Sequence, residues 1–273
     1  MKAMVRELTR KLGIYKGLRR ISDAVKWSTG FDYLYDATHP EFHRLKQAEL
    51  ALLKSQVPAA SLCFDVGANI GDKTGILLQH RCRVVAVEPI KRNLEILKKR
   101  YGGHANVAIV PVAASDQIGR QTINITDDAL AFSTFSQKWV DALEDEKSNR
   151  WGIAVKTSTD VVETSTLDAL IGQFGVPYYI KIDVEGHEIN VLRGLTRKIP
   201  LISFEANLPE FVEETRACIS HLLSLDQSAA FNYTGENPID FELSDWRDAT
   251  ALLAILDKGD LRFMEIYCRT TPS

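Results

Sequence analysis

The chain has 273 residues, of which 45% are hydrophobic and 25% charged, and a formal net charge of −3, which is ordinary globular composition. Its four cysteines, at positions 63, 82, 218 and 268, are too scattered for a zinc knuckle or a C-x-x-C redox pair. No apolar run reaches the roughly 18 to 20 residues that span a bilayer. We therefore expect a cytoplasmic protein with reduced thiols.

The N-terminal 30 residues are basic, with eight Lys and Arg against two acidic residues, which leaves the remainder of the chain acidic. Apolar residues recur there at three- or four-residue steps, which predicts an amphipathic helix with a basic face. We expect that helix to pack on the main domain or on a second subunit, or to make a weak contact with a membrane surface. A second helix follows Pro40 and ends near Pro58. We expect residues 1–57 to form a helical extension and residues 58–273 one domain.

Beyond Pro58, short apolar runs alternate with helical patterns. The runs are residues 62–66, 83–88, 107–114, 178–184 and 200–206. Because they show little polar alternation, they predict strands covered on both faces and hence a doubly wound α/β fold. Between the third and fourth runs, residues 121–126 and 151–159 predict shorter strands flanking a helix at 136–147. Residues 231–236 and 261–269 predict a terminal antiparallel pair.

The first chemical signal is the stretch FDVGANIGDKTG, which follows the run at 62–66. Asp65 ends the strand, and Gly67 and Gly71 bracket a turn before a helix whose first N–H groups favour anionic groups. A dinucleotide fingerprint requires glycine where this chain has Asn69. Glu88 ends the second strand, where an acid commonly accepts hydrogen bonds from ribose hydroxyls. Together these features indicate a nucleoside site.

Three stretches, DVGANIG (65–71), VEP (87–89) and KIDVEGHEINVLRGL (181–195), resemble the FkbM family of S-adenosylmethionine-dependent methyltransferases. The resemblance extends from about residue 62 to about residue 206. It implies a Rossmann-like class I methyltransferase fold with a mostly parallel seven-stranded sheet whose last strand is antiparallel. It also implies methyl transfer to a hydroxyl oxygen of a carbohydrate or a natural product.

The resemblance assigns cofactor contacts residue by residue. Around the methionine part of S-adenosylmethionine it implies Asp65, Gly67, Ala68, Asn69 and Gly71. Glu88 is expected to hold the ribose, and Ser115 and Asp116 are expected to lie near the adenine. The stretches before residue 58 and after about residue 210 carry no matching motif, so the resemblance says little about the acceptor.

The stretch YYIKIDVEGHE (178–188) combines a buried strand with ionisable groups. As a strand, it directs Tyr179, Lys181 and Asp183 to one face and the intervening apolar residues to the other. Lys181 is then covered and requires a carboxylate partner, for which Asp65 and Glu205 are the candidates.

The catalytic candidates follow from the chemistry of a hydroxyl acceptor, which holds its proton far above neutral pH and benefits from a general base. Asp183 or His187 is expected to be that base. A divalent cation held by carboxylates is an alternative that we do not favour. Glu185, Glu205 and Ser133, the last in the covering stretch LAFSTFS (130–136), are expected to bind the acceptor, a small molecule or glycan.

Two other functions share parts of this pattern. A nicotinamide-dependent oxidoreductase would use the same sheet and Glu88 but leaves the cluster at 178–195 unexplained. A non-catalytic nucleoside-binding module is the second alternative. Nucleic acid is not an expected partner, because the body is acidic and Asp183-Val-Glu-Gly stands where a base-amine methyltransferase carries Asn-Pro-Pro-aromatic. The sequence does not decide whether the chain forms a homo-oligomer.

Overall fold

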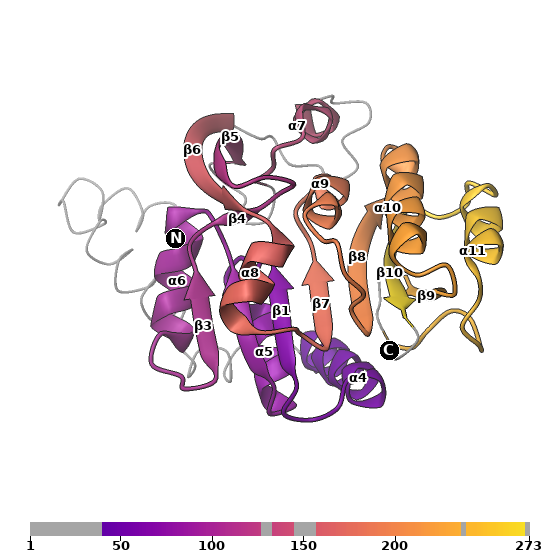
Figure 1. Cartoon of the computed structure of the whole chain (residues 1–273), viewed down its shortest axis with the longest axis horizontal. Helices are drawn as coiled ribbons and strands as arrows, with labels where there is room; N and C mark the ends of the chain where they lie inside the picture. Colours follow the sequence, from indigo (N-terminus) through magenta and orange to yellow (C-terminus); the bar gives the residue numbers. More distant parts are fainter. Residues whose placement is uncertain (1–39, 127–132, 145–156, 236–238, 271–273) are drawn as a thin grey trace, which may run out of the picture.

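The computed structural model describes residues 40–126, 133–144, 157–235 and 239–270 (Figure 1). The basic helix expected within residues 1–30, and positions 151–156 of the strand expected at 151–159, lie outside the described residues. Within the described ranges, no helix is long and apolar enough to cross a membrane.

Seven strands form the main sheet, in the order β3-β2-β1-β7-β8-β10-β9. In that order, their bounds are Val107–Val110, Arg83–Val87, Leu62–Val66, Tyr179–Ile182, Leu201–Asn207, Phe263–Arg269 and Ala230–Thr234. Pairing is parallel from β3 to β8, and β10 is antiparallel to both β8 and β9. The expected doubly wound sheet with an antiparallel last strand is confirmed, and so is the terminal antiparallel pair.

Helices cover both faces of this sheet. On one face lie α4 (Pro40–Gln56), α5 (Asp72–Gln79) and α6 (Lys91–Tyr101); on the other lie α8 (Leu167–Phe174), α9 (Glu188–Arg193), α10 (Val212–Leu225) and α11 (Ala249–Leu256). In β7, Tyr179 packs in the cluster that holds Leu50 and Leu53 of α4, whereas Ile180 and Ile182 pack in the cluster that holds α8 and α10. This confirms the expected alternation of faces along the strand.

One strand prediction was wrong: residues 107–114 do not form a single strand. The run divides at Pro111, whose nitrogen carries no hydrogen for a ladder bond. Residues 107–110 stay in the main sheet as β3, while β4 (Ala113–Ala114) joins a separate three-stranded sheet in the order β4-β6-β5. In that sheet β5 (Gly119–Thr126) pairs antiparallel with β6 (Thr157–Ser165).

The chain order reverses between β1 and β7. It runs outward through β1, β2 and β3, then crosses back, passing through the small sheet and α7 (Gln137–Glu144), to place β7 on the other side of β1. Figure 1 shows this as neighbouring strands of very different colour, indigo β1 beside orange β7. Open α/β sheets bind ligands outside the carboxyl ends of the strands at such a switch point.

Candidate active site

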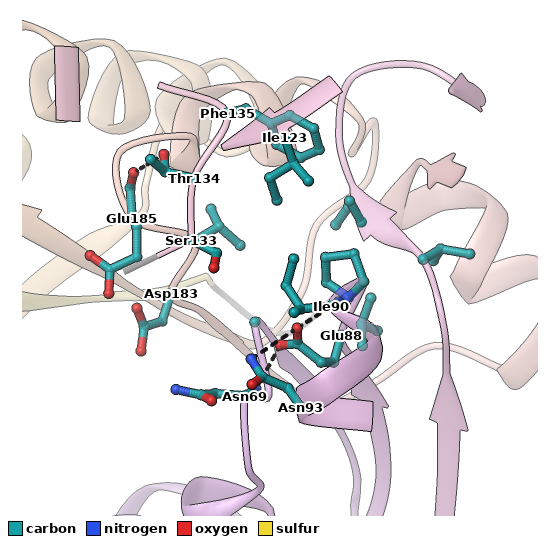
Figure 2. A pocket seen from close by; sticks show the side chains of 17 residues that line it. Asn69, Glu88, Ile90, Asn93, Ile123, Ser133, Thr134, Phe135, Asp183 and Glu185 are labelled. Carbon is teal, nitrogen blue, oxygen red and sulfur yellow. Dashed lines mark hydrogen bonds between the residues drawn. The ribbon is translucent and has the colours of Figure 1, made fainter. Parts of the chain in front are cut away.

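A solvent-open cavity of about 700 Å³ lies at this switch point (Figure 2). The lining comes from the ends of β1, β2 and β7 and the loops after them, from α6, β4 and β5, and from a segment between β5 and α7. It comprises Gly67, Asn69, Val87, Glu88, Pro89, Ile90, Asn93, Val112, Ala113, Ala114, Ile123, Ser133, Thr134, Phe135, Asp183, Val184 and Glu185.

The glycine turn after β1 touches the loop after β7. Gly67 has φ +78°, and a Cβ built on it would lie 1.8 Å from the carbonyl oxygen of Asp183. Only glycine fits, because both the backbone conformation and the space exclude a side chain. The amides of Gly67 and Ala68 both donate to the Val87 carbonyl at 3.0 Å. The ends of β1, β2 and β7 are therefore locked together.

Gly71 serves packing instead. It has φ +87°, and a Cβ there would meet the side chains of Leu97 at 2.5 Å and Tyr101 at 2.6 Å. Both neighbours belong to α6, so the second glycine of the turn allows α6 to approach α5 closely. Gly71 is not among the cavity-lining residues.

Glu88 is the best-satisfied carboxylate of the cavity. Its Oε2 accepts from the Asn69 amide at 2.8 Å, and its Oε1 accepts from the Ile90 amide at 2.8 Å and from Asn93 Nδ2 at 3.3 Å. Burial raises the pKa of Glu88 to about 7, and these hydrogen bonds oppose that rise. Both oxygens are fixed in direction before any ligand arrives.

Asn69 offers an unused acceptor in the same wall. Its backbone is left-handed, with φ +50°, a conformation that asparagine tolerates better than most residues. Among the described residues, its buried Oδ1 has no hydrogen-bond partner. Buried polar atoms are rarely left in this state, so the atom fits a donor group on a ligand.

The loop after β7 is strained. Glu185 has φ +54° and Gly186 φ +87°. A non-glycine residue in this conformation costs about 1–3 kcal/mol and persists only where its surroundings hold it. The Glu188 carboxylate accepts from the Val184 amide at 3.3 Å and from the Gly186 amide at 3.1 Å. We call residues 183–187 the acidic turn.

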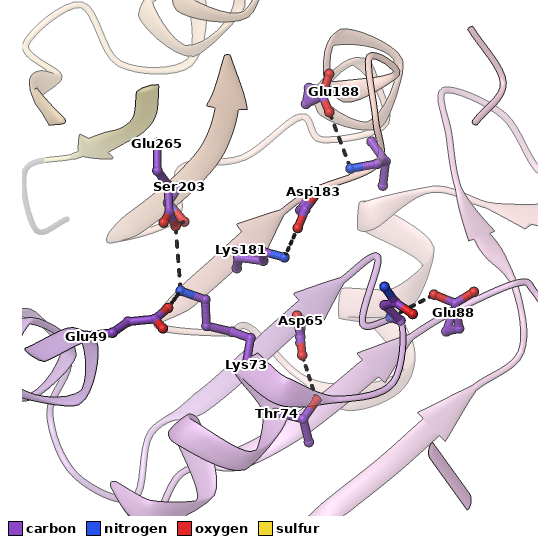
Figure 3. A network of polar contacts seen from close by, with 12 residues as sticks. Glu49, Asp65, Lys73, Thr74, Glu88, Lys181, Asp183, Glu188, Ser203 and Glu265 are labelled. Atoms are coloured by element: carbon purple, nitrogen blue, oxygen red, sulfur yellow. Dashed lines mark hydrogen bonds and ion pairs between the residues drawn. The ribbon is translucent and has the colours of Figure 1, made fainter. Parts of the chain in front are cut away.

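Lys181 pairs with a partner that the sequence did not indicate. Its ammonium contacts Asp183 Oδ2 at 2.5 Å, whereas Asp65 accepts from Thr74 Oγ1 at 2.6 Å (Figure 3). The expected direct pairing with Asp65 or Glu205 was therefore wrong. Residues two apart share a strand face, which brings Lys181 and Asp183 together. Burial lowers the pKa of Lys181, but the three carboxylates around it raise that pKa overall.

Three carboxylates crowd the ends of β7 and β8. Burial, followed by the charge of Asp183, raises the pKa values of both Glu185 and Glu205 well above the ordinary range. Figure 2 shows the side chains of Asp183 and Glu185 on the opposite side of the cavity from Glu88. After the roles that the sequence predicts for them, we call Gly67, Asn69 and Glu88 the cofactor side, and Asp183, Glu185 and Glu205 the acceptor side. Across the described ranges, no group of three or more His, Cys, Asp and Glu could hold a metal ion.

His187 lies behind the cavity wall. Its Nε2 shares a hydrogen bond of 3.1 Å with Ser115 Oγ, and its ring lies 4.8 Å from the Phe135 ring. Burial lowers the pKa of His187 to about 4, against the opposing charge of Asp116. The imidazole is therefore neutral at physiological pH and is engaged with Ser115.

The structure brings some of the sequence-predicted residues to the cavity and leaves others behind it. Those that line it are Gly67, Asn69, Glu88, Ser133, Asp183 and Glu185. Those outside the lining are Asp65, Ala68, Gly71, Ser115, Asp116, His187 and Glu205. The roles assigned to both groups remain predictions.

Asn93, Thr134 and Phe135 are among the lining residues that sequence reasoning did not single out. Thr134 and Phe135 belong to the stretch expected to cover the methyl group, so their region was predicted but not their contacts. Asn93 carried a weaker signal: it precedes Leu94 on the apolar face of α6, where an amide needs a partner.

These features define a class I methyltransferase: the strand order, the glycine turn at the switch point, and an acid with two fixed oxygens after β2. The chain matches the Methyltransferase FkbM domain over residues 65–233, more than half its length, and it therefore belongs to the FkbM methyltransferase family. The expected family is confirmed, and with it S-adenosylmethionine as the cofactor.

No curated protein matches the chain. Similar solved structures include the plantazolicin methyltransferase BpumL in complex with SAH, with a TM-score of 0.42 and 10% identity over 98% of this chain and 100% of that one. A precorrin 8W decarboxylase from Methanobacterium thermoautotrophicum has a TM-score of 0.44 and 13% identity over 82% and 90%. Aeropyrum pernix fibrillarin with natively bound S-adenosyl-L-methionine has a TM-score of 0.40 and 11% identity over 81% and 73%. Similarities at this level give no information about the acceptor.

Proposed function

We propose that the protein transfers the methyl group of S-adenosylmethionine to a hydroxyl oxygen of a neutral carbohydrate or glycosylated metabolite. The observation that carries this proposal is the Asp183 carboxylate, which lines the cavity on a loop in backbone contact with the glycine turn. The strand ends thereby hold the candidate base Asp183 close to the glycine turn, where we expect S-adenosylmethionine to bind.

The cofactor side fits S-adenosylmethionine. The two directed oxygens of Glu88 suit the two ribose hydroxyls, and the orphaned Oδ1 of Asn69 suits an N–H or O–H donor of the ligand. Gly67 leaves the backbone bare where the ligand approaches. The chemistry that the cofactor supplies when bound is an electrophilic methyl group on positively charged sulfur.

The acceptor side supplies the proton transfer. Lys181 contacts one oxygen of Asp183 and fixes the direction of that carboxylate. Asp183 would take the proton of the acceptor hydroxyl whose oxygen receives the methyl group, while the donor sulfur would leave as a neutral thioether. A positioned base of this kind typically contributes 10²- to 10⁴-fold. The fixed contact between the strand ends would also align the acceptor oxygen with the methyl carbon, which contributes further to the rate.

The lining of the cavity indicates the class of acceptor. None of the described lining residues is Lys or Arg, so the wall offers no cation to a phosphate or carboxylate group, whereas its carboxyl groups hydrogen-bond readily to neutral hydroxyls. Nucleic acid is a poor fit for the same reason, because its affinity depends on Lys and Arg. A neutral polyol is the acceptor class that this wall favours.

The test combines methyl-labelled cofactor with a panel of neutral, amino and phosphorylated glycans, and mass spectrometry identifies the labelled product. We expect label on neutral hydroxyl acceptors. We expect Asp183→Asn to lower turnover at least about 100-fold while the cofactor Kd, measured by calorimetry, changes less than about threefold. Asp260→Asn, which alters an exposed carboxylate between α11 and β10, is the matched control and should behave as wild type.

The outcomes separate the alternatives. Intact turnover in Asp183→Asn would remove this residue from the mechanism. Label found only on amines or nucleic acid would contradict the acceptor class. Turnover that disappears on exhaustive chelation would support the metal alternative.

A further inference from the structure

Residues 133–136, between β5 and α7, form a cover segment over the acidic turn (Figure 2). We propose that Thr134 is a positioning residue for methyl transfer. Its buried hydroxyl holds the backbone of Glu185 in the left-handed conformation that presents the Glu185 carboxylate to the acceptor. This inference rests on the proposed function.

The Thr134 hydroxyl both donates and accepts a hydrogen bond. It donates to the Glu185 carbonyl at 2.5 Å and accepts from the Ser136 amide at 2.8 Å. The Thr134 backbone pairs with Asn124 of β5 through two hydrogen bonds of 2.9 Å. With 1% of its surface exposed, the residue joins the small sheet to the acidic turn. A hydroxyl is required because valine has the same shape but can neither donate nor accept.

The acidic turn needs this hold for two independent reasons. Glu185 is an L-residue at φ +54°, a conformation that relaxes unless it is restrained. Burial, followed by the charge of Asp183, also raises the pKa of Glu185, so the charged form of its carboxyl group is disfavoured there. Glu188 restrains the amides on either side of Glu185, and Thr134 restrains the carbonyl of Glu185 itself. The loop is thus held from two directions.

A second contact ties the cover segment to the far end of the turn. The Phe135 ring lines the cavity and packs 4.8 Å from the His187 ring. The cover segment therefore touches the acidic turn at both Glu185 and His187. A change in the cover segment should reach the acceptor side and leave Glu88 on the opposite wall undisturbed.

The experiment compares Thr134→Val with Thr134→Ser, using Thr122→Val on the exposed face of β5 as the matched control. We expect Thr134→Val to lower kcat at least tenfold with the cofactor Kd within threefold of wild type. Thr134→Ser should restore kcat to within threefold, and Thr122→Val should match wild type. A wild-type kcat in Thr134→Val, or equal losses of kcat and cofactor affinity, would overturn the proposal.

Hydrogen exchange provides a readout that needs no acceptor. In Thr134→Val, the amides of residues 185–188 should exchange at least tenfold faster while those of α5 stay unchanged. Unchanged exchange at residues 185–188 in Thr134→Val would overturn the positioning role. Faster exchange there, together with the absence of any methylated glycan, would overturn only the proposed function. If Thr134→Val does not fold, Thr134→Cys, with its weak thiol donor, replaces it. Its kcat should then fall at least threefold below that of Thr134→Ser, and equal values would overturn the proposal.

Discussion

The cofactor side and the acceptor side hold their carboxylates in different ways. Glu88 accepts three hydrogen bonds, two of them from backbone amides. Glu185 and Glu205 instead have pKa values that are raised by burial and by the charge of Asp183, and Glu185 lies on a turn that departs from relaxed geometry. One wall is preorganised by backbone amides, and the other is kept in place by Lys181, Glu188 and Thr134. The two walls therefore differ in what holds their carboxyl groups.

The most severe way to break this arrangement is Gly67→Ala, because Gly67 joins the two sides. The new Cβ would lie 1.8 Å from the Asp183 carbonyl, so strand β1 must move away from β7. We expect the free energy of unfolding to fall by more than about 3 kcal/mol and both cofactor binding and turnover to be lost. Urea denaturation and calorimetry measure these losses.

The control for that variant is Gly172→Ala. Gly172 lies in α8, and a Cβ built there meets no atom within 4 Å. Alanine should therefore stabilise the protein by up to about 1 kcal/mol. If Gly67→Ala were as stable as this control, the close contact between the two sides would be refuted.

Glu88→Gln sharpens the comparison by changing the cofactor side alone. Charged hydrogen bonds contribute about 1.5–3 kcal/mol each, so we expect the cofactor Kd to rise roughly 10- to 100-fold. Turnover at saturating cofactor should change much less. A cofactor Kd that stays at the wild-type value would exclude Glu88 from ribose binding.

The same residue predicts a pH dependence with two opposite signs. The pKa of Glu88 is raised from about 4.5 to about 7 in the folded protein, so its contribution to stability is lost as pH rises through that window. Cofactor affinity should rise over the upper part of the window, because the ionised carboxylate accepts hydrogen bonds best. Glu88→Gln should remove both contributions, which denaturation and calorimetry between pH 5 and 8 can compare.

The smallest expected effect separates strain from charge on the acceptor side. Glu185→Gly relieves both, and we expect the free energy of unfolding to rise by about 1 kcal/mol while turnover falls. Glu185→Gln removes only the charge and should stabilise less. If Glu185→Gly proved less stable than wild type, the acidic turn would not be strained.

Much of the main sheet could be predicted from the local sequence pattern. Uninterrupted apolar runs located β1, β2, β7 and β8, and acids following those strands located the cavity. Lys181 was correctly expected to be buried beside carboxylates, but its direct partner depended on how the chain turns after β7. Pro111 was visible in the sequence, yet only the fold shows that the chain leaves the main sheet there.

The contacts that hold the acidic turn were not predictable in this way. Thr134 and Glu185 are 51 positions apart, and Ser115 and His187 are 72 apart. Periodicity carries no information about pairs at such separations. Oligomeric state and the role of the basic segment within residues 1–30 remain predictions.

The contact between Gly67 and the Asp183 carbonyl has a consequence for how such enzymes can diversify. Two main-chain segments make this contact, so in the proposed mechanism the separation of Gly67 from Asp183 does not depend on side chains. Under the proposed function, substitutions at Ser133 or Phe135, which line the cavity, would reshape the acceptor pocket and leave this backbone contact in place. An engineer who wishes to redirect this enzyme to another acceptor should vary those two positions first and leave the contact between the two loops intact.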